Sequence, residues 1–148
     1  MTSLVDKVYD NIRKNSLLPR GSRILVAVSG GADSVALLEV FKALRHNMGI
    51  SIIVAHYNHA LRVSAVKDQK FVEQLAGKFG FPFVTETNRT KRPQKGSLEE
   101  FARNIRYDFL LRTARRLTRT NRCRANTRSI TTAITAGPTT GRATPCGA

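Results

Sequence analysis

The sequence predicts an α/β fold with a parallel, doubly wound sheet. Over the first 117 residues, segments whose apolar residues follow helical spacing alternate with short β-branched runs, and two glycines follow the first run. The predicted order is helix, strand, helix, strand, helix, strand, helix, which is typical of parallel sheets. Right-handed crossovers then place helices on both faces of the sheet. The length of 148 residues suits one domain of common size.

The first two predicted elements lie before the glycines. An amphipathic helix with Ser3 as its N-cap is predicted from apolar residues on one face, namely Leu4, Val5, Val8, Tyr9 and Ile12. Pro19 and Gly21 then interrupt any regular structure over 18–22. The apolar run 24–28 predicts a buried strand.

The remaining elements continue the alternation. A helix starts near Ala32, and the β-branched run 52–55 predicts the second strand. Helical spacing over 66–79 predicts another helix, and 81–85 predicts a short third strand. Ser97 and Glu100 then have the spacing of a capping box and open a long helix. The apolar stripe of that helix comprises Leu98, Phe101, Ala102, Ile105 and Phe109.

The charge of the chain favours a polyanionic partner. Lys and Arg number 25 against 10 Asp and Glu, so the formal net charge is +15, and nucleic acid is the first candidate. A basic but otherwise ordinary solvated surface is the alternative. No apolar run approaches the roughly 20 residues that span a bilayer, and the N-terminus lacks the apolar stretch of a signal peptide. We therefore expect a cytoplasmic protein with no membrane partner.

Residues 118–148 differ in composition from the rest of the chain. They contain nine Thr and five Arg but no Leu, Val, Phe, Tyr, Lys, Asp or Glu. Such a segment cannot bury enough apolar surface to offset its ordering entropy. We therefore expect a disordered, low-complexity tail after a domain over 1–117. The Thr, Arg and Ala content is also typical of GC-rich codons read in a shifted frame, and a frameshift product is our hypothesis for this tail.

The segment 29–34, Ser-Gly-Gly-Ala-Asp-Ser, lies between the first strand and its following helix. Gly30 and Gly31 allow a tight turn that brings successive backbone N–H groups against an anion. The helix N-terminus adds a positive dipole end, and Ser29 and Ser34 can donate hydroxyl hydrogen bonds. The segment has neither the Gly-Lys-Ser/Thr ending of a Walker A loop nor the Gly-x-Gly-x-x-Gly fingerprint. We predict a phosphate or pyrophosphate site, with a plain Gly-Gly turn as the alternative.

Four residues within and outside this loop carry charge or ligand chemistry. The Asp33 carboxylate would repel phosphate unless a metal lay between them, which favours Mg²⁺ on a bound nucleotide. His56 follows the second strand, at the sheet edge where ligand residues gather. Arg103 and Arg106 are three residues apart, so they share a helix face and can offset phosphate charge. A capping role for the histidine and solvated positions for the arginines are the alternatives.

Three motifs together resemble one enzyme family. The loop is similar to the pyrophosphate loop of the N-type ATP pyrophosphatases, whose PP-loop domains have a Rossmann-like fold of the adenine nucleotide alpha hydrolase-like type. Segments 56–62 (His-Tyr-Asn-His-Ala-Leu-Arg) and 99–107 (Glu-Glu-Phe-Ala-Arg-Asn-Ile-Arg-Tyr) resemble the His-x-Asn-His-x-Leu-Arg and Ala-Arg-x-x-Arg-Tyr signatures of tRNA(Ile)-lysidine synthase. The resemblance covers roughly residues 4–117.

This resemblance implies a reaction with ATP and Mg²⁺. ATP adenylates the C2 carbonyl oxygen of the wobble cytidine in tRNA(Ile) with a CAU anticodon, and the ε-amine of L-lysine displaces AMP to form lysidine. It implies that Asp33 and Arg106 are catalytic and that Asp33 binds the metal. The nucleotide-binding residues that it implies are Ala27, Val28, Ser29, Gly30, Gly31, Ala32, Asp33, Ser34, His56 and Arg103.

The sequence also departs from the family pattern. After residue 117 it has no counterpart of the family's fourth strand or of its His-x-x-x-Asp-Asp-Gln-x-x-Glu-Thr motif. We therefore expect an incomplete PP-loop domain that is weakly active or inactive. With three strands, the apolar run 24–28 would form an exposed edge, which favours self-association.

Two other functions stay open. One is a tRNA cytidine thiolase or another PP-loop adenylating enzyme, although thiolases usually have Lys where Ala32 stands, together with Cys-x-x-Cys pairs. The two cysteines here, Cys123 and Cys146, form no such pair. The other is a non-catalytic, basic fragment that binds nucleotide or RNA.

Overall fold

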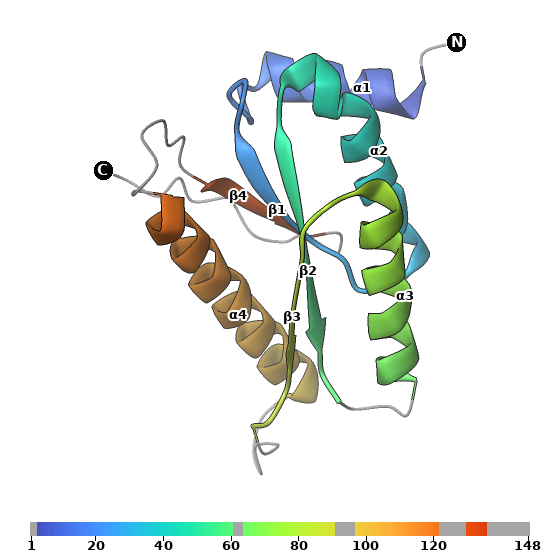
Figure 1. Ribbon diagram of the computed structural model, residues 1–148, viewed down its shortest axis with the longest axis vertical. Coiled ribbons are helices and arrows are strands. Elements are labelled where there is room, and N and C mark those ends of the chain that lie inside the picture. The colour runs from blue at the N-terminus through green and yellow to red at the C-terminus, as the bar shows by residue number, and fades with distance from the viewer. Residues whose placement is uncertain (1–2, 61–63, 91–96, 122–129, 136–148) are drawn as a thin grey trace.

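Within the described residues, a parallel sheet of four strands runs through the centre of the structure (Figure 1). The computed structural model describes residues 3–60, 64–90, 97–121 and 130–135. The strands are β1 (Arg23–Ala27), β2 (Ser51–Asn58), β3 (Phe83–Thr87) and β4 (Ile130–Thr135). Their order in the sheet is β3-β2-β1-β4, and each neighbouring pair is parallel.

Helices cover both faces of this sheet, as expected for a doubly wound fold. The helices are α1 (Leu4–Lys14), α2 (Ala32–Met48), α3 (Ala65–Phe79) and α4 (Leu98–Asn121). The first three lie on one side, and α4 lies alone on the other (Figure 1). Alternate residues of β1 serve the two faces: Ile24 and Val26 pack in the core with α2 and α3, whereas Leu25 packs with Phe109 of α4. The predicted fold class is therefore confirmed.

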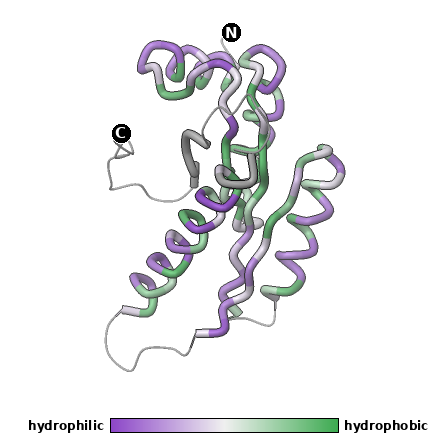
Figure 2. Tube along the Cα trace, turned by 60° about the vertical axis from the view of Figure 1, so that its left-hand side comes forward, coloured by the Kyte–Doolittle hydropathy of each residue, from purple (hydrophilic) through white to green (hydrophobic). Residues whose placement is uncertain are grey.

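Hydropathy follows the same layers. The hydrophobic residues gather on the central strands β1 and β2, and hydrophilic residues recur along the helices (Figure 2). Ile24, Leu25, Val26 and Val54 are completely buried in this core. No helix in the described part of the chain is both long and apolar enough to cross a membrane.

Helix α1 begins with the N-cap that the sequence predicts. The Ser3 hydroxyl accepts a hydrogen bond from the Asp6 backbone N–H at 3.1 Å, and the Asp6 carboxylate accepts one from the Ser3 N–H at 3.0 Å. This is a complete capping box, with Asp in the position where Glu or Gln is usual. Ile12 is the buried residue of the helix and attaches it to the core.

Two strand boundaries differ from the sequence prediction. Strand β2 extends to Asn58, three residues beyond the predicted end, so His56 lies on the strand and not after it. Strand β3 begins at Phe83, because Pro82 has no N–H for the sheet ladder and contributes only its carbonyl oxygen, which accepts from Val54 N at 2.8 Å. Both strands therefore carry polar residues at the carboxyl edge of the sheet.

The prediction that residues 118–148 lack structure is wrong for two stretches. Helix α4 continues to Asn121, and residues 130–135 form strand β4. Five of the six residues of β4 are Ile or Thr, whose β-branched side chains favour extended backbone. The average composition of residues 118–148 does not show that residues 130–135 favour a strand. Residues 122–129 and 136–148 lie outside the described residues, so the prediction stays untested there.

The prediction of an exposed edge at β1 is also wrong. Strand β1 pairs with β2 on one side and with β4 on the other, with a register shift between Arg23 and Ile24 on the β4 side. The strands at the edges of the described sheet are β3 and β4. Within the described residues, β1 therefore offers no unpaired edge for self-association.

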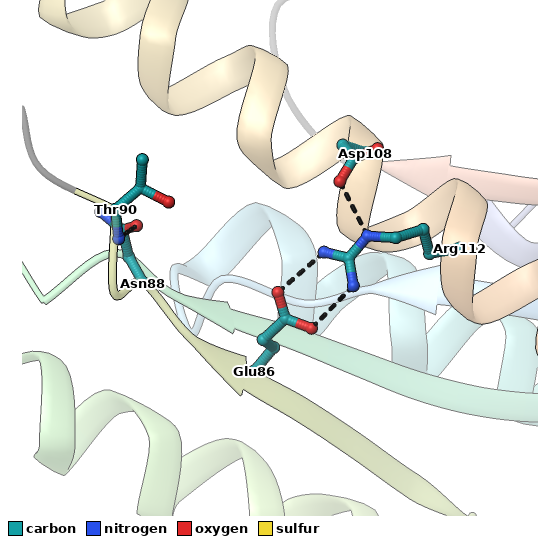
Figure 3. A network of polar contacts seen from close by, with 5 residues as sticks. All are labelled: Glu86, Asn88, Thr90, Asp108 and Arg112. Carbon is teal, nitrogen blue, oxygen red and sulfur yellow. Dashed lines mark hydrogen bonds and ion pairs between the residues drawn. The ribbon is translucent and has the colours of Figure 1, made fainter. Parts of the chain in front are cut away.

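A polar cluster ties α4 to the edge strand β3 (Figure 3). The Arg112 guanidinium donates two hydrogen bonds to the Glu86 carboxylate, at 2.8 and 3.1 Å. Its Nε donates a third, of 2.7 Å, to Asp108 one turn earlier on the same helix. Beyond β3, the Asn88 side chain accepts the Thr90 N–H at 2.8 Å and turns the chain away from the strand. The Arg112 cluster links the two elements by polar contacts at the molecular surface.

Candidate functional site

The predicted glycine loop connects β1 to α2. The Val28 N–H donates to Ala55 O at 2.9 Å and extends the pairing of the two strands by one bond. Gly30 has a φ of +96°, a conformation that L side chains rarely adopt. A Cβ at Gly30 would lie 3.6 Å from both Asp68 Cβ and Val72 Cγ2 of α3. A side chain would thus find ordinary packing space beside α3, and it is the positive φ that favours glycine in this turn.

Two serines hold the loop in shape. The buried Ser34 hydroxyl donates to Gly31 O at 2.8 Å and accepts the Ser29 N–H at 3.2 Å. The two hydroxyl oxygens are themselves 3.2 Å apart, and Ser29 Oγ also accepts the Gly31 N–H at 3.4 Å. Because Ser34 is engaged within the loop, its position favours a role in holding the loop. Ser29 is exposed beside the pocket described below.

The N-terminus of α2 has the features of an anion site. Its N-cap is Gly31, which provides no side-chain hydrogen bond to the first turn. The first N–H groups of a helix have no intrahelical partner and carry the positive end of the helix dipole. Asp33 is exposed in this first turn, and within the described residues its carboxylate makes no hydrogen bond or ion pair. The turn thus presents backbone donors and one free carboxylate.

His56 fastens the carboxyl end of β2 to that of β1. The ring is buried, and its Nδ1 lies 2.8 Å from Val28 O. A carbonyl oxygen only accepts, so Nδ1 carries the proton and donates. In the neutral ring, Nε2 is then the hydrogen-bond acceptor. The ring lines the pocket beside the loop.

A pocket of about 260 Å³ lies at this carboxyl edge, between the sheet, the start of α3 and the middle of α4. Its lining residues are Ala27, Val28, Ser29, Ala55, His56, Tyr57, Asn58, His59, Ala65, Asp68, Arg106, Phe109 and Leu110. Five of them are predicted site residues: Ala27, Val28, Ser29, His56 and Arg106. The structure therefore brings the strand ends, the first residue of the loop and one arginine of α4 together.

The other predicted residues lie next to the pocket or away from it. Residues 30–34 form the turn and the first turn of α2, and they do not line the pocket. Arg103 is also absent from its lining, and its guanidinium lies over the Tyr107 ring, 5.2 Å from the centroid. Of the two arginines on α4, Arg106 is thus the one that lines the pocket.

The structure adds residues that the sequence interpretation did not assign to the site. Asn58 closes the pocket near α3: its amide donates to Gln69 Oε1 at 3.0 Å, and its oxygen accepts the Ala60 N–H at 2.9 Å. Tyr57 contacts the His59 ring edge to face, with centroids 5.0 Å apart. Both residues and His59 belong to the quoted segment 56–62, so the motif carried the signal. Asp68, by contrast, belongs to no motif, and it lines the pocket because of the way α3 packs on the sheet.

Comparison with known proteins agrees with this geometry. A family model described as a PP-loop domain matches residues 1–129. The U34-tRNA thiolase NcsA from Methanococcus maripaludis, solved with its 4Fe-4S cluster, superposes with a TM-score of 0.62 at 13% sequence identity. The match covers 74% of this chain and 40% of that chain, and it shows a shared fold.

The curated relatives compared here carry the name tRNA(Ile)-lysidine synthase. One from Dehalococcoides mccartyi (strain CBDB1) is 42% identical over 115 residues, which is 75% of this chain and 24% of the relative. One from Thermotoga maritima is 40% identical over 104 residues, or 68% of this chain and 25% of the relative. A third, from Petrotoga mobilis, is 37% identical over 114 residues and is covered to 37%.

These relatives confirm the resemblance that the three motifs indicate, and this chain spans about a quarter to a little over a third of their length. The family model accounts for most of the chain, including the glycine loop and the lining of the pocket. This chain is a member of the PP-loop domain family.

Proposed function

We propose that this chain binds ATP and that the start of α2 holds the pyrophosphate part of the nucleotide. One observation carries the proposal: α2 begins directly after the Gly30 turn, and no side chain caps its first N–H groups. A helix N-terminus of this kind suits a phosphate group. The neighbouring pocket, which Ser29 connects to the loop, provides space for the rest of the nucleotide.

Asp33 is the residue that would hold Mg²⁺. Magnesium is usually bound by one or two carboxylates together with substrate phosphates, and it does not require a cage of protein ligands. The Asp33 carboxylate beside the anion site is exposed and has no partner within the described residues, which fits that pattern. When bound, Mg²⁺ supplies positive charge that offsets the charge of the phosphates. Without a cation, Asp33 would oppose binding of the pyrophosphate.

The finer function that we propose is ATP-dependent ligation of L-lysine to the wobble cytidine of tRNA(Ile), in the cytoplasm. The names of the relatives and the three shared motifs support it. In this proposal Arg106 lines the pocket and offsets charge on the reacting phosphates, and Arg103 adds positive potential from the preceding turn. His56, fixed by Val28 O, forms the floor between the two strand ends.

A tRNA thiolase is the second candidate, and the fold match to a U34-tRNA thiolase favours it. At 13% identity this match supports the fold alone. Ala32 stands where thiolases usually have Lys, and the two cysteines of the sequence, Cys123 and Cys146, form no Cys-x-x-Cys pair. These features make lysine ligation the better-supported reaction.

Calorimetry and a turnover assay on the purified chain test the proposal. We expect magnesium-dependent ATP binding, and the absence of ATP binding would overturn it. Pyrophosphate release that requires both L-lysine and tRNA(Ile) would support lysidine formation, whereas sulfur transfer to tRNA would support the thiolase. ATP binding without either reaction would support a nucleotide-binding chain and would overturn the proposed ligation.

A further inference from the structure

Two buried nitrogen atoms among the pocket-lining residues have no hydrogen-bond partner within the described part of the chain. They are His59 Nδ1, at the end of β2, and Arg106 Nε, on α4. Buried polar atoms are nearly always paired, so an unpaired atom calls for a specific explanation. Both atoms belong to residues that line one pocket, so a ligand bound in that pocket can supply their acceptor.

We propose that His59 and Arg106 form a subsite for an anionic oxygen of a bound ligand. Arg106 Nε always carries a proton and donates. With its proton on Nδ1, the His59 ring donates toward the same acceptor. A ligand oxygen that accepts both hydrogen bonds therefore satisfies both atoms, and a negatively charged oxygen is favoured because it also offsets the Arg106 charge. Which ligand supplies it rests on the proposed function, whereas the subsite rests on these two atoms.

The surroundings of His59 keep it ready for such an oxygen. Burial, the Arg106 cation and the neighbouring His56 all lower the pKa of His59, so the ring is neutral at physiological pH. Tyr57 contacts the ring edge to face and limits its rotation. Asp68 of α3 lines the same pocket and is the carboxylate among the lining residues. An anion next to Arg106 would offset the arginine charge and raise the pKa of His59.

Arg106 is likewise held in place. Its guanidinium carbon lies 5.9 Å from the centroid of the Tyr107 ring, which is within the range of a cation–π contact. A buried donor without a partner is costly, and a ligand oxygen in the pocket is a partner that fits Arg106 Nε.

Two ligands of the proposed reaction carry an anionic oxygen that could occupy the subsite. One is the phosphate next to the ribose of the nucleotide, which AMP retains. The other is the carboxylate of free L-lysine. Pyrophosphate serves as the negative control and should leave the His59 signals unmoved, because in the proposed function it occupies the start of α2 and not the pocket.

The experiment reads His59 directly by NMR of the imidazole groups. The chain has three histidines, so His46→Gln and His56→Gln variants assign the signals. We expect AMP or L-lysine to shift the Nδ1 signal of His59 and raise its pKa, while exposed His46 serves as the internal control. The ligand that produces the shift identifies the source of the oxygen. If neither AMP, L-lysine nor ATP moves the His59 signals, the subsite does not exist.

Matched variants separate the hydrogen bonds from packing. His59→Asn keeps a donor at the δ position, whereas His59→Phe removes it and keeps a ring. We expect His59→Phe to weaken the active ligand by about tenfold and His59→Asn by much less, because a hydrogen bond to a charged group is lost in the first alone. Arg106→Lys keeps the charge but has no Nε–H and should also weaken binding by about tenfold. Equal affinities of His59→Asn and His59→Phe would contradict the subsite.

The same titrations distinguish this inference from the proposed function. Magnesium-dependent ATP binding with unmoved His59 signals would reject the subsite and leave the nucleotide loop intact. A His59 shift with L-lysine but no ATP binding would support the subsite and reject ATP as the ligand of α2. Circular dichroism of each variant confirms that the fold is retained.

Discussion

At the scale of single residues, the loop divides its tasks between side chains. Asp33 is exposed and has no partner in the described part of the chain, so its contribution is its charge toward a ligand. Ser34 is buried and hydrogen-bonded on both sides, so its contribution is the shape of the turn. Substitutions at the two positions should therefore separate binding from stability.

We predict that Asp33→Asn weakens ATP binding in the presence of Mg²⁺ by about tenfold, since one charge-assisted contact to the metal is lost. AMP has no pyrophosphate, so its affinity should change by less than about twofold. Calorimetry with both nucleotides measures the difference. Glu39→Gln, an exposed acid further along the same helix, is the matched control and should leave both affinities unchanged. An equal loss for ATP and AMP would remove Asp33 from the metal site.

Ser34→Ala is expected to destabilise the fold by about 1–3 kcal/mol, because Gly31 O and the Ser29 N–H both lose a partner. Urea denaturation followed by circular dichroism measures the free energy of unfolding. Ser29→Ala provides the comparison, since the exposed Ser29 hydroxyl can be replaced by water and should cost less than about 1 kcal/mol. If the two variants were equally stable, Ser34 would not hold the loop.

At the scale of elements, α4 connects the pocket to the edge of the sheet. Phe109 and Leu110 bury its inner face against β1 and β2, while Arg112 bonds Glu86 on β3 (Figure 3). All three members of the Arg112 cluster are substantially exposed, so their contribution to stability is modest. The charges of these three residues nevertheless influence the pKa of Tyr57.

We predict that Arg112→Gln raises the pKa of Tyr57 further. Burial raises this pKa first and the Glu86 and Asp108 carboxylates add to it, whereas the Arg112 cation opposes them. Removing the cation leaves the effects that raise the pKa. A spectrophotometric titration of the three tyrosines, with Tyr57→Phe for assignment, measures the change. Arg115→Gln is the control, because it removes an equal charge from an exposed position of α4. An equal shift of the Tyr57 pKa in that variant would contradict a local effect of Arg112. The loss of stability should be no more than about 1 kcal/mol.

Much of the element order could be predicted because local signals agree with the fold. The Ser3 cap, the apolar run in β1 and the glycines before α2 each depend on neighbours in sequence. The end of β2 could not be predicted so well, because His56 and Asn58 are polar and are buried only through partners on β1 and α3. For the site, motifs identified His56 and Arg106, but the entry of Asp68 into the pocket depends on how α3 packs.

At the scale of the whole molecule, β4 gives β1 two neighbours and so makes it an interior strand. The composition of residues 118–148 does not reveal this strand, because it averages over 31 residues, whereas a strand needs about six. The backbone of an extended segment can pair with a parallel neighbour even where Leu and Val are absent. The short β-branched run 130–135 is thus a better predictor of a strand than the average composition of residues 118–148.

We predict that backbone amides of residues 24–27 exchange slowly with solvent, because both sides of β1 are paired. Ile134→Pro should increase exchange in β1, since proline removes an N–H and fits poorly in a regular strand. Ile134→Val preserves a β-branched residue and serves as the control. Hydrogen exchange read by mass spectrometry, on samples verified as monomers, measures both. Fast exchange of β1 in the unaltered chain would contradict the pairing with β4.

The pairing of β1 with β4 has an evolutionary consequence. The contacts that join these two strands in the sheet are made by backbone atoms, which every residue except proline provides in full. Many residues after α4 can therefore be substituted while β1 keeps its pairing with β4. The condition is that a few of these residues still favour extended backbone. A lineage can replace the chemistry contributed by the segment after α4 and still retain the architecture that supports the glycine loop.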